Sequence, residues 1–207
     1  MKRKRLVANN EKKGILGETE LGVLKSFFPE GKEITLKTLL ERSGYSYEPV
    51  YRTIKSLVDK RIVNARRFGK TLVYDLDFKK REAKIAFFMY ANERTIKFCE
   101  KHKNISFAFS NSPEEKIDFL AIFGSYAKST QTDKSDIDVL CVTSNKERVE
   151  TFIATIKRKY GLDIRAVVIP RTEFSKIKKE NEVFWDHLVK YGTIFNGYEL
   201  FYHNAYL

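Results

Sequence analysis

Apolar residues at helical spacing mark the first element of the chain. Leu21, Leu24 and Phe28 recur three to four positions apart, and the pattern stops at Pro29 and Gly31. Residues with this spacing lie on one face of a helix, and proline and glycine commonly end helices. The pattern therefore predicts a helix that ends before Pro29.

Two further helices follow by the same reasoning. A short apolar stripe, Leu36, Leu39 and Leu40, ends before Gly44. The next segment, YEPVYRTIKSLVDKRIV, has an apolar face that consists of Val50, Ile54, Leu57 and Val58. Ser46 precedes it as a suitable N-cap, and Pro49 falls in the first turn, where proline is tolerated. The sequence thus predicts three helices in the first 60 residues.

A hairpin is predicted directly after the third helix. Ile62 and Val63 on one side and LVYDL (residues 72–76) on the other flank the basic, glycine-containing segment RRFGK. Two apolar runs around such a turn are typical of paired antiparallel strands.

The order helix, helix, turn, helix, hairpin over about residues 15–78 resembles the winged helix-turn-helix family. The resemblance implies that the third helix enters the major groove of double-stranded DNA and that the hairpin tip contacts phosphates. The expected DNA-binding residues are Tyr47, Tyr51, Arg52 and Lys55 on the helix and Arg66, Arg67 and Lys70 on the hairpin. Winged helices also form homodimers or hold a neighbouring domain without contacting DNA, so these alternatives stay open.

A long amphipathic segment, REAKIAFFMYANERTIKFCEKHK, begins near residue 81. Its apolar side is expected to consist of Ile85, Phe88, Met89, Ile96 and Cys99. No linker rich in Pro, Gly or Ser precedes it. We therefore expect a winged-helix domain at 1–80 and a second domain at 81–207, held together by this helix.

The second part of the chain places two acids on a segment with the pattern of a buried strand. The apolar run IDFLAIF is followed by GSYAKSTQTDKS and then by DIDVLCV, which begins at Asp136. Because side chains alternate along a strand, Asp136 and Asp138 point the same way while Ile137 points into the core. Two neighbouring carboxylates repel each other, and oxygen ligands at this spacing suit Mg²⁺ or Mn²⁺. The pattern predicts a divalent metal site.

Two neighbouring motifs extend this site. Asp163 lies near the start of LDIRAVVI, a strand-like run that follows an amphipathic helix, so three carboxylates are expected to converge. Arg165 shares the strand face of Asp163 and is expected to pair with an acid, with contact to phosphate as the alternative. The Gly124-Ser125 turn opens a short helix after IDFLAIF, where backbone N–H groups and the serine hydroxyl can face a phosphate.

The ordered set of an apolar strand, Gly-Ser, ten residues, Asp-x-Asp and a later strand with an acid resembles the minimal nucleotidyltransferases of the DNA polymerase beta superfamily, over about residues 115–197. The resemblance implies that Gly124 and Ser125 bind the triphosphate of ATP or another nucleoside triphosphate. It also implies that Asp136, Asp138 and Asp163 bind the metal and carry catalysis. The chain has Ala127-Lys128-Ser129 where the family has a small residue, Arg and Gly, so Lys128 keeps the positive charge at the nucleotide.

The expected fold class is α+β, with an N-terminal winged helix-turn-helix followed by a small mixed-sheet nucleotidyltransferase domain with flanking helices. Composition agrees with two globular domains: of 207 residues, 43% are hydrophobic and 14% aromatic. No apolar run is long enough to span a membrane, and the basic start has no apolar signal core behind it, so a cytoplasmic location is expected.

Charge is unevenly distributed along the chain. The net charge is +12, and residues 1–80 contain 19 Lys and Arg against 10 Asp and Glu. A basic surplus in one part is typical of a region that meets a polyanion, although a solvated basic face has the same composition.

Three functions remain open at this point. The first is an active nucleotidyltransferase with a protein, RNA or small-molecule acceptor. The second is a DNA-binding regulator that only senses the nucleotide. The third is an antitoxin that transfers AMP to a toxin of the HEPN ribonuclease family, because the Gly-Ser and Asp-x-Asp spacing also resembles such antitoxins. The presence of all three acids favours the first, with the third as its biological setting.

Overall fold

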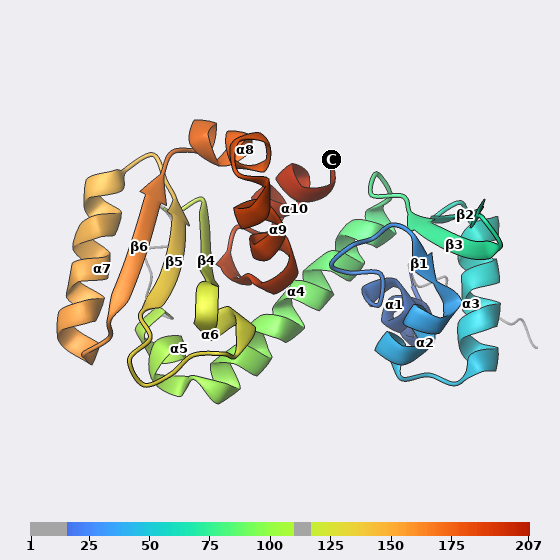
Figure 1. Cartoon of the computed structure of the whole chain (residues 1–207), viewed down its shortest axis with the longest axis horizontal. Coiled ribbons are helices and arrows are strands. Elements are labelled where there is room, and N and C mark those ends of the chain that lie inside the picture. Colours follow the sequence, from blue (N-terminus) through green and yellow to red (C-terminus); the bar gives the residue numbers. More distant parts are fainter. Residues whose placement is uncertain (1–15, 110–116) are drawn as a thin grey trace, which may run out of the picture.

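A long helix, α4 (Arg81–Lys101), connects two groups of elements (Figure 1). The computed structural model describes residues 16–109 and 117–207. The basic start of the chain and the segment around residues 111–115 lie outside these described residues. No helix in the described ranges is long and apolar enough to cross a lipid bilayer.

The N-terminal group contains three helices and a small antiparallel sheet. Its elements are α1 (Glu18–Lys25), β1 (Ile34–Thr35), α2 (Leu36–Ser43), α3 (Tyr47–Asp59), β2 (Val63–Phe68) and β3 (Thr71–Leu76). The strands lie in the order β1-β3-β2, with β3 antiparallel to both neighbours. The three helices and the hairpin occur where they were predicted, whereas β1, only two residues long, was not. Assignment of this group to the winged-helix family stays a prediction.

Local signals account for the ends of these helices. Thr35 caps α2, because its hydroxyl accepts a hydrogen bond of 3.1 Å from the Thr38 N–H. Gly44 ends α2 in a left-handed conformation with φ of 71°. Ser46 occupies the N-cap of α3 as predicted, but its side chain makes no capping hydrogen bond.

The C-terminal group is built on a four-stranded mixed sheet. Its elements are α5 (Lys103–Phe109), β4 (Phe119–Phe123), α6 (Gly124–Lys128), β5 (Ile137–Val142), α7 (Lys146–Tyr160), β6 (Ile164–Ile169), α8 (Arg171–Glu180), α9 (Glu182–Tyr191), β7 (Thr193–Asn196) and α10 (Tyr198–Tyr206). The strand order is β6-β5-β4-β7, in which β5 and β6 are parallel and the other pairs are antiparallel. A mixed α+β fold with a small mixed sheet is therefore confirmed.

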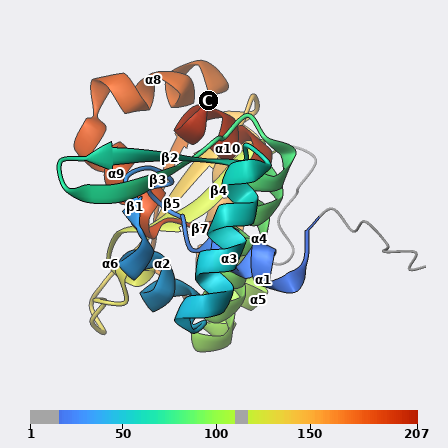
Figure 2. The ribbon, with the colours of Figure 1, turned by 90° about the vertical axis from the view of Figure 1, so that its right-hand side faces the viewer.

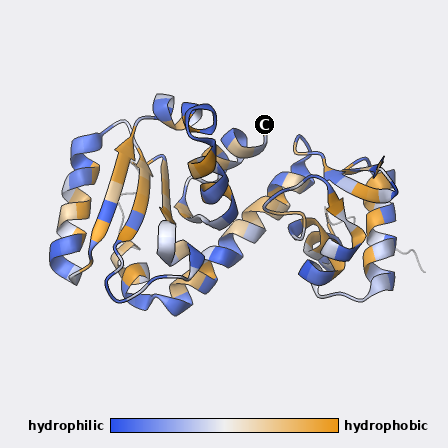
Figure 3. Ribbon diagram, viewed as in Figure 1, coloured by the Kyte–Doolittle hydropathy of each residue, from blue (hydrophilic) through white to orange (hydrophobic). Residues whose placement is uncertain are grey.

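Both faces of this sheet are covered, which explains why its strands are almost continuously apolar (Figure 3). Leu120, Ile122, Val139 and Cys141 pack against the side of α5 and α7. The alternate residues of the same strands pack in a second cluster with residues of α8, α9 and α10. Trp185 is 3% exposed and belongs to that second cluster.

The buried face of α4 differs from the predicted one. Met89 and Ile96 are 40% and 48% exposed. The buried positions are instead Ala83, Ala86, Phe87, Ala91 and Phe98. The alanines at three of these positions allow neighbouring elements to pack close to the helix. The covered face is therefore the one that permits close packing and not the one with the largest apolar side chains.

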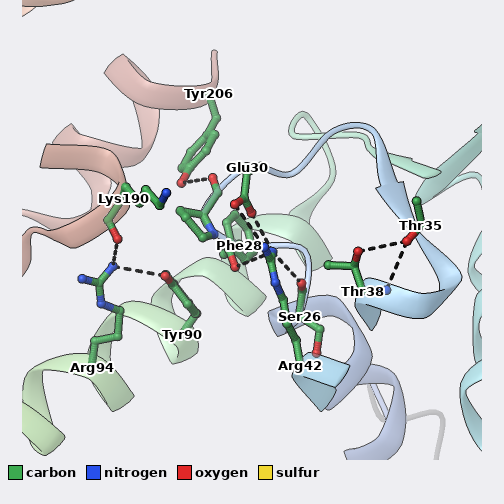
Figure 4. Close-up of polar contacts among 11 residues, drawn as sticks. Ser26, Phe28, Glu30, Thr35, Thr38, Arg42, Tyr90, Arg94, Lys190 and Tyr206 are labelled. Carbon is green, nitrogen blue, oxygen red and sulfur yellow. Dashed lines mark hydrogen bonds and ion pairs between the residues drawn. The ribbon is translucent and has the colours of Figure 1, made fainter. Parts of the chain in front are cut away.

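Aromatic residues join the two groups of elements. The Tyr202 hydroxyl donates a buried hydrogen bond of 2.7 Å to the Phe78 carbonyl. The Tyr206 hydroxyl donates one of 3.0 Å to the Pro29 carbonyl, as Figure 4 shows. The ring of Phe78 stacks on Tyr206 with centroids 4.6 Å apart. One hydrophobic cluster therefore runs from the N-terminal helices through α4 to α10. Packing is continuous across the expected domain boundary near residue 80.

Candidate active site

Asp136 and Asp138 lie at the start of β5, at the edge of the sheet where β4 ends. Asp136 immediately precedes the strand, and Asp138 is its second residue, paired in register with Phe123 at the end of β4. Ile137 between them is 2% exposed and points to the opposite face. The predicted alternation is thus confirmed, and both carboxylates face the same side.

The Gly124 turn lies directly against the Asp138 carboxylate. Gly124 has φ of 67°, and a Cβ at this position would come 2.0 Å from Asp138 Oδ2. Any other residue would clash with the acid and would also be strained by the positive φ. The glycine and the second acid of the motif therefore form one structural unit, although 13 residues separate them in the sequence.

Burial and the charge of Arg165 act in opposite directions on the ionisation of Asp138. Partial burial, reinforced by the neighbouring Asp136, raises the pKa of Asp138, while Arg165 opposes the shift. Arg165 lies opposite Asp138 on β6, and its Nε is 3.0 Å from Asp136 Oδ2. The expected pairing of Arg165 with an acid is confirmed. A second cation near Asp138 would favour its ionised form.

The backbone of Asp163 lies next to this pair of acids, but its carboxylate is directed toward Lys157. The Ile137 N–H donates a hydrogen bond of 2.7 Å to the Asp163 carbonyl. The Asp163 side chain is 79% exposed, and its Oδ1 is 3.9 Å from Lys157 Nζ on α7. Within the described parts of the chain, no group of three His, Cys, Asp or Glu side chains is placed to hold a metal ion.

The prediction that three carboxylates converge is therefore corrected: the structure brings Asp136 and Asp138 together with Arg165, without the Asp163 carboxylate. The reason lies at the junction before β6. The helix α7 ends at Tyr160, Gly161 adopts a left-handed conformation, and Asp163 follows before the strand begins. There its carboxylate turns toward a lysine in the last turn of α7. The catalytic and metal-binding roles of these acids stay predictions.

Lys128 and Ser125 occupy the short helix α6 that follows Gly124. Lys128 Nζ is 3.3 Å from His187 Nδ1 and 5.4 Å from the centre of the Tyr191 ring, both on α9. Ser125 is the second residue of α6. His187 was not predicted as a site residue, because 59 residues separate it from Lys128 and no sequence motif connects the two.

A pocket of about 440 Å³ lies at the junction of α4 and α5, and its lining includes His102, Tyr126 and Leu162. Tyr126 belongs to α6 and Leu162 precedes Asp163, so the pocket borders two of the predicted motifs. The His102 ring lies 5.4 Å from the Tyr126 ring, and its Nε2 has no hydrogen-bond partner within the described ranges. Burial, together with the nearby charge of Lys101, lowers the pKa of His102 and thus favours the neutral ring. A pocket of this size can hold a small organic group.

The predicted DNA-binding residues lie on the exposed side of α3 and on the hairpin β2–β3, which stand at the front in Figure 2. Tyr47 and Tyr51 are 55% and 45% exposed and stack on each other with an interplanar angle of 9°. Lys55, Arg67 and Lys70 are exposed. Two of the predicted DNA-binding residues form ion pairs within the chain: Arg52 with Glu48, and Arg66 with Asp75.

Comparisons with known proteins show a similarity for the second part of the chain. Residues 93–195 match the family model described as polymerase beta, nucleotidyltransferase. This part is similar to a polymerase beta-type nucleotidyltransferase domain. The match includes Gly124, Asp136, Asp138 and Asp163 and supports nucleotidyl transfer in general. It begins within α4, so it does not test the expected boundary near residue 80.

Other comparisons add little to this assignment. A crystal structure of a candidate nucleotidyltransferase from Sulfolobus solfataricus is 23% identical over 42% of this chain and 80% of that chain, with a TM-score of 0.27. No curated protein matches the chain. The nucleotidyltransferase assignment of residues 93–195 therefore rests on the family match.

Proposed function

We propose that residues 81–207 act as a metal-dependent nucleotidyltransferase, in which an acceptor hydroxyl attacks the α-phosphate of ATP or another nucleoside triphosphate, takes up the nucleoside monophosphate and releases pyrophosphate. The observation that carries this proposal is the Asp138 carboxylate held against the Gly124 turn, with Asp136 beside it. In this proposal the Gly124 turn would bind phosphate, and Asp136 and Asp138 next to it would bind a divalent cation. The family match over residues 93–195 supports the same reaction class.

Each residue of the site has a role in this proposal. Gly124 and Ser125 approach the triphosphate, and Lys128 offsets its charge. Asp136 and Asp138 would hold Mg²⁺ or Mn²⁺. Two carboxylates fit such an ion, because Mg²⁺ is commonly bound by one or two carboxylates together with substrate phosphates and water. The bound ion would neutralise charge on the phosphate oxygens during transfer.

Asp163 would help to deprotonate the acceptor hydroxyl. Its backbone is hydrogen-bonded to Ile137, so a rotation of the exposed side chain away from Lys157 would direct the carboxylate toward the acid pair. An exposed side chain with one ion-pair contact of 3.9 Å has little to lose on such a rotation.

The test is transfer of label from α-labelled ATP in the presence of Mg²⁺ and host-cell extract. We expect a labelled macromolecule or metabolite with the native chain. Asp138→Asn should lower transfer at least about 100-fold, because it removes a ligand charge without changing side-chain size. Asp163→Asn should abolish transfer while nucleotide binding persists. Asp133→Asn, an exposed acid just before the motif, is the matched control and should keep full activity.

A second candidate, the nucleotide-sensing regulator, is favoured by the contact between Arg165 and Asp136. An arginine on one acid competes with a metal ion for the same charge. For this function we expect nucleotide binding without label transfer, together with a DNA affinity that changes when nucleotide is added. Because such coupling is reciprocal, DNA would then shift the nucleotide affinity by the same factor.

We also propose that residues 1–80 bind double-stranded DNA through α3 and the hairpin. The exposed Arg67, Lys70 and Lys55 and the basic surplus of this part of the chain support the proposal. A HEPN-type toxin as acceptor and a homodimer remain predictions from the sequence.

A further inference from the structure

A pocket of about 430 Å³ lies between α1, α2 and α4, away from the turn that carries Gly124. Four basic side chains line it: Lys25 from α1, Arg42 from α2, and Arg94 and Lys97 from α4. The acid in its lining is Glu93. A volume in this range is typical of pockets for small ligands.

Two of the four positive charges are neutralised within the chain. Lys25 Nζ lies 2.5 Å from Glu93 Oε1. The Arg42 guanidinium forms two hydrogen bonds with Glu30, of 2.6 and 3.0 Å, and its pKa is raised, first of all by this contact (Figure 4). These pairs hold the walls of the pocket in place.

The other two charges have no carboxylate partner within residues 16–109 and 117–207. Arg94 Nη1 donates to the Tyr90 hydroxyl and to the Lys190 carbonyl, at 3.1 and 2.9 Å (Figure 4). Its Nε and Nη2 are left without a partner in the described part of the chain. Lys97 is exposed and lies three residues further along α4, on the same face. The pocket therefore has a local excess of two positive charges.

The rest of the lining is aromatic. Tyr90 stacks on Phe28 with ring centroids 5.6 Å apart, and Arg94 lies over the Tyr90 ring. Tyr45 packs so closely against α1 that a Cβ on Gly22 would come 2.7 Å from its ring. Flat aromatic walls beside two cationic groups without a carboxylate partner in the described residues fit a ligand with a phosphate at one end and a sugar or ring at the other.

We propose that this pocket binds a small phosphate monoester. Such a group carries about −1.5 to −2 charges at pH 7, which matches the two uncompensated charges of Arg94 and Lys97. The planar guanidinium of Arg94 can donate two parallel hydrogen bonds to phosphate oxygens, and the ammonium group of Lys97 adds a point charge. The site is separate from the candidate active site and does not depend on its activity.

Isothermal titration of the full chain with inorganic phosphate and with AMP tests the proposal. We expect saturable binding that weakens at least about tenfold in the double variant Arg94→Gln, Lys97→Gln. Tighter binding of AMP than of phosphate would show that the aromatic walls contact the rest of the ligand. Lys97→Gln alone removes an exposed side chain, so it should keep the fold and still weaken binding.

Lys176→Gln with Lys179→Gln is the matched control, because both lysines are exposed at the same spacing on α8. This pair should change the dissociation constants by less than about twofold. Equal weakening in both double variants would mean that net charge alone attracts phosphate, which overturns the proposal. Binding that is lost in Asp136→Asn but unchanged in Lys97→Gln would place the phosphate at the candidate active site and would also overturn it.

Discussion

At the scale of single residues, one acid of the candidate site, Asp138, lowers the stability of the folded chain at neutral pH. The Asp138 carboxylate is partly buried against Gly124 and repelled by Asp136, and its pKa is raised from the ordinary value of 3.8. An ionised carboxylate whose pKa is raised by folding destabilises the folded state at neutral pH. A residue retained at such a cost is typical of a functional site.

Replacement of this acid should therefore stabilise the protein. Because the folded-state pKa of Asp138 is raised, the folded chain holds the proton more tightly, and stability falls as pH rises above about 3.8. In EDTA at pH 7, we expect Asp138→Asn to raise the melting temperature by roughly 1–3 °C. The gain should shrink as the pH approaches 4, in scans monitored by circular dichroism. Asp163→Asn, at a more exposed position, should show no such gain; a melting temperature of Asp138→Asn that is lower at all pH values would contradict the expectation.

At the scale of elements, the hairpin β2–β3 combines basic residues of two kinds. Arg66 contacts both Asp75 and Glu33, at 2.5 and 2.7 Å, and these contacts raise its pKa. Arg67 and Lys70 are exposed at the hairpin tip and have no ion pair within the described residues. The pairing of Arg66 connects β2 to β3 and to the residue before β1, so this arginine supports the sheet more than it presents charge to a ligand.

This difference can be measured through the salt dependence of DNA binding by the full chain. Each phosphate contact that is lost should reduce the slope of log affinity against log salt by about 1 unit. Arg67→Ala with Lys70→Ala should thus reduce the slope by about 1 to 2 units, in fluorescence anisotropy titrations with a short duplex. Arg66→Ala should leave the slope unchanged. If the native chain does not bind duplex DNA even at low salt, the N-terminal group is instead a protein-interaction module.

At the scale of the whole molecule, the two groups of elements share one core. Phe78 stands at the junction, 8% exposed, with its carbonyl bonded to Tyr202 and its ring stacked on Tyr206. Burial raises the pKa of both tyrosines, Tyr202 and Tyr206. Domains that share a buried aromatic cluster should not unfold independently.

A single unfolding transition is therefore expected. Trp185, the single tryptophan of the chain, reports on the C-terminal group, whereas Phe78 lies before α4. Phe78→Ala should lower the free energy of unfolding by about 3 to 5 kcal/mol. The loss should appear in the urea transition of Trp185 fluorescence as well as in circular dichroism. Phe107→Ala, at a position 63% exposed, should change little. An unchanged Trp185 transition in Phe78→Ala would show that the groups unfold separately.

Periodicity and turn residues in the sequence were sufficient to predict most elements that position the site. Local rules place a helix end at Gly44, a strand before Gly124 and a strand after Asp136, because these rules depend only on neighbouring residues. The same alternation puts Asp136 and Asp138 on one side of β5. Helices α5, α8 and α10 were not predicted, since their apolar patterns are short or incomplete and their packing partners are distant in the sequence.

What the sequence by itself determined is thus the order of the elements and the motif of glycine and two acids. The tertiary structure decided which groups meet: Arg165 with Asp136, Asp163 with Lys157, and His187 with Lys128. It also decided the buried face of α4 and the basic pocket between α1, α2 and α4. The physical reason is that backbone preferences act over a few residues, whereas side-chain contacts depend on strand register and on the packing of helices that are distant in the chain.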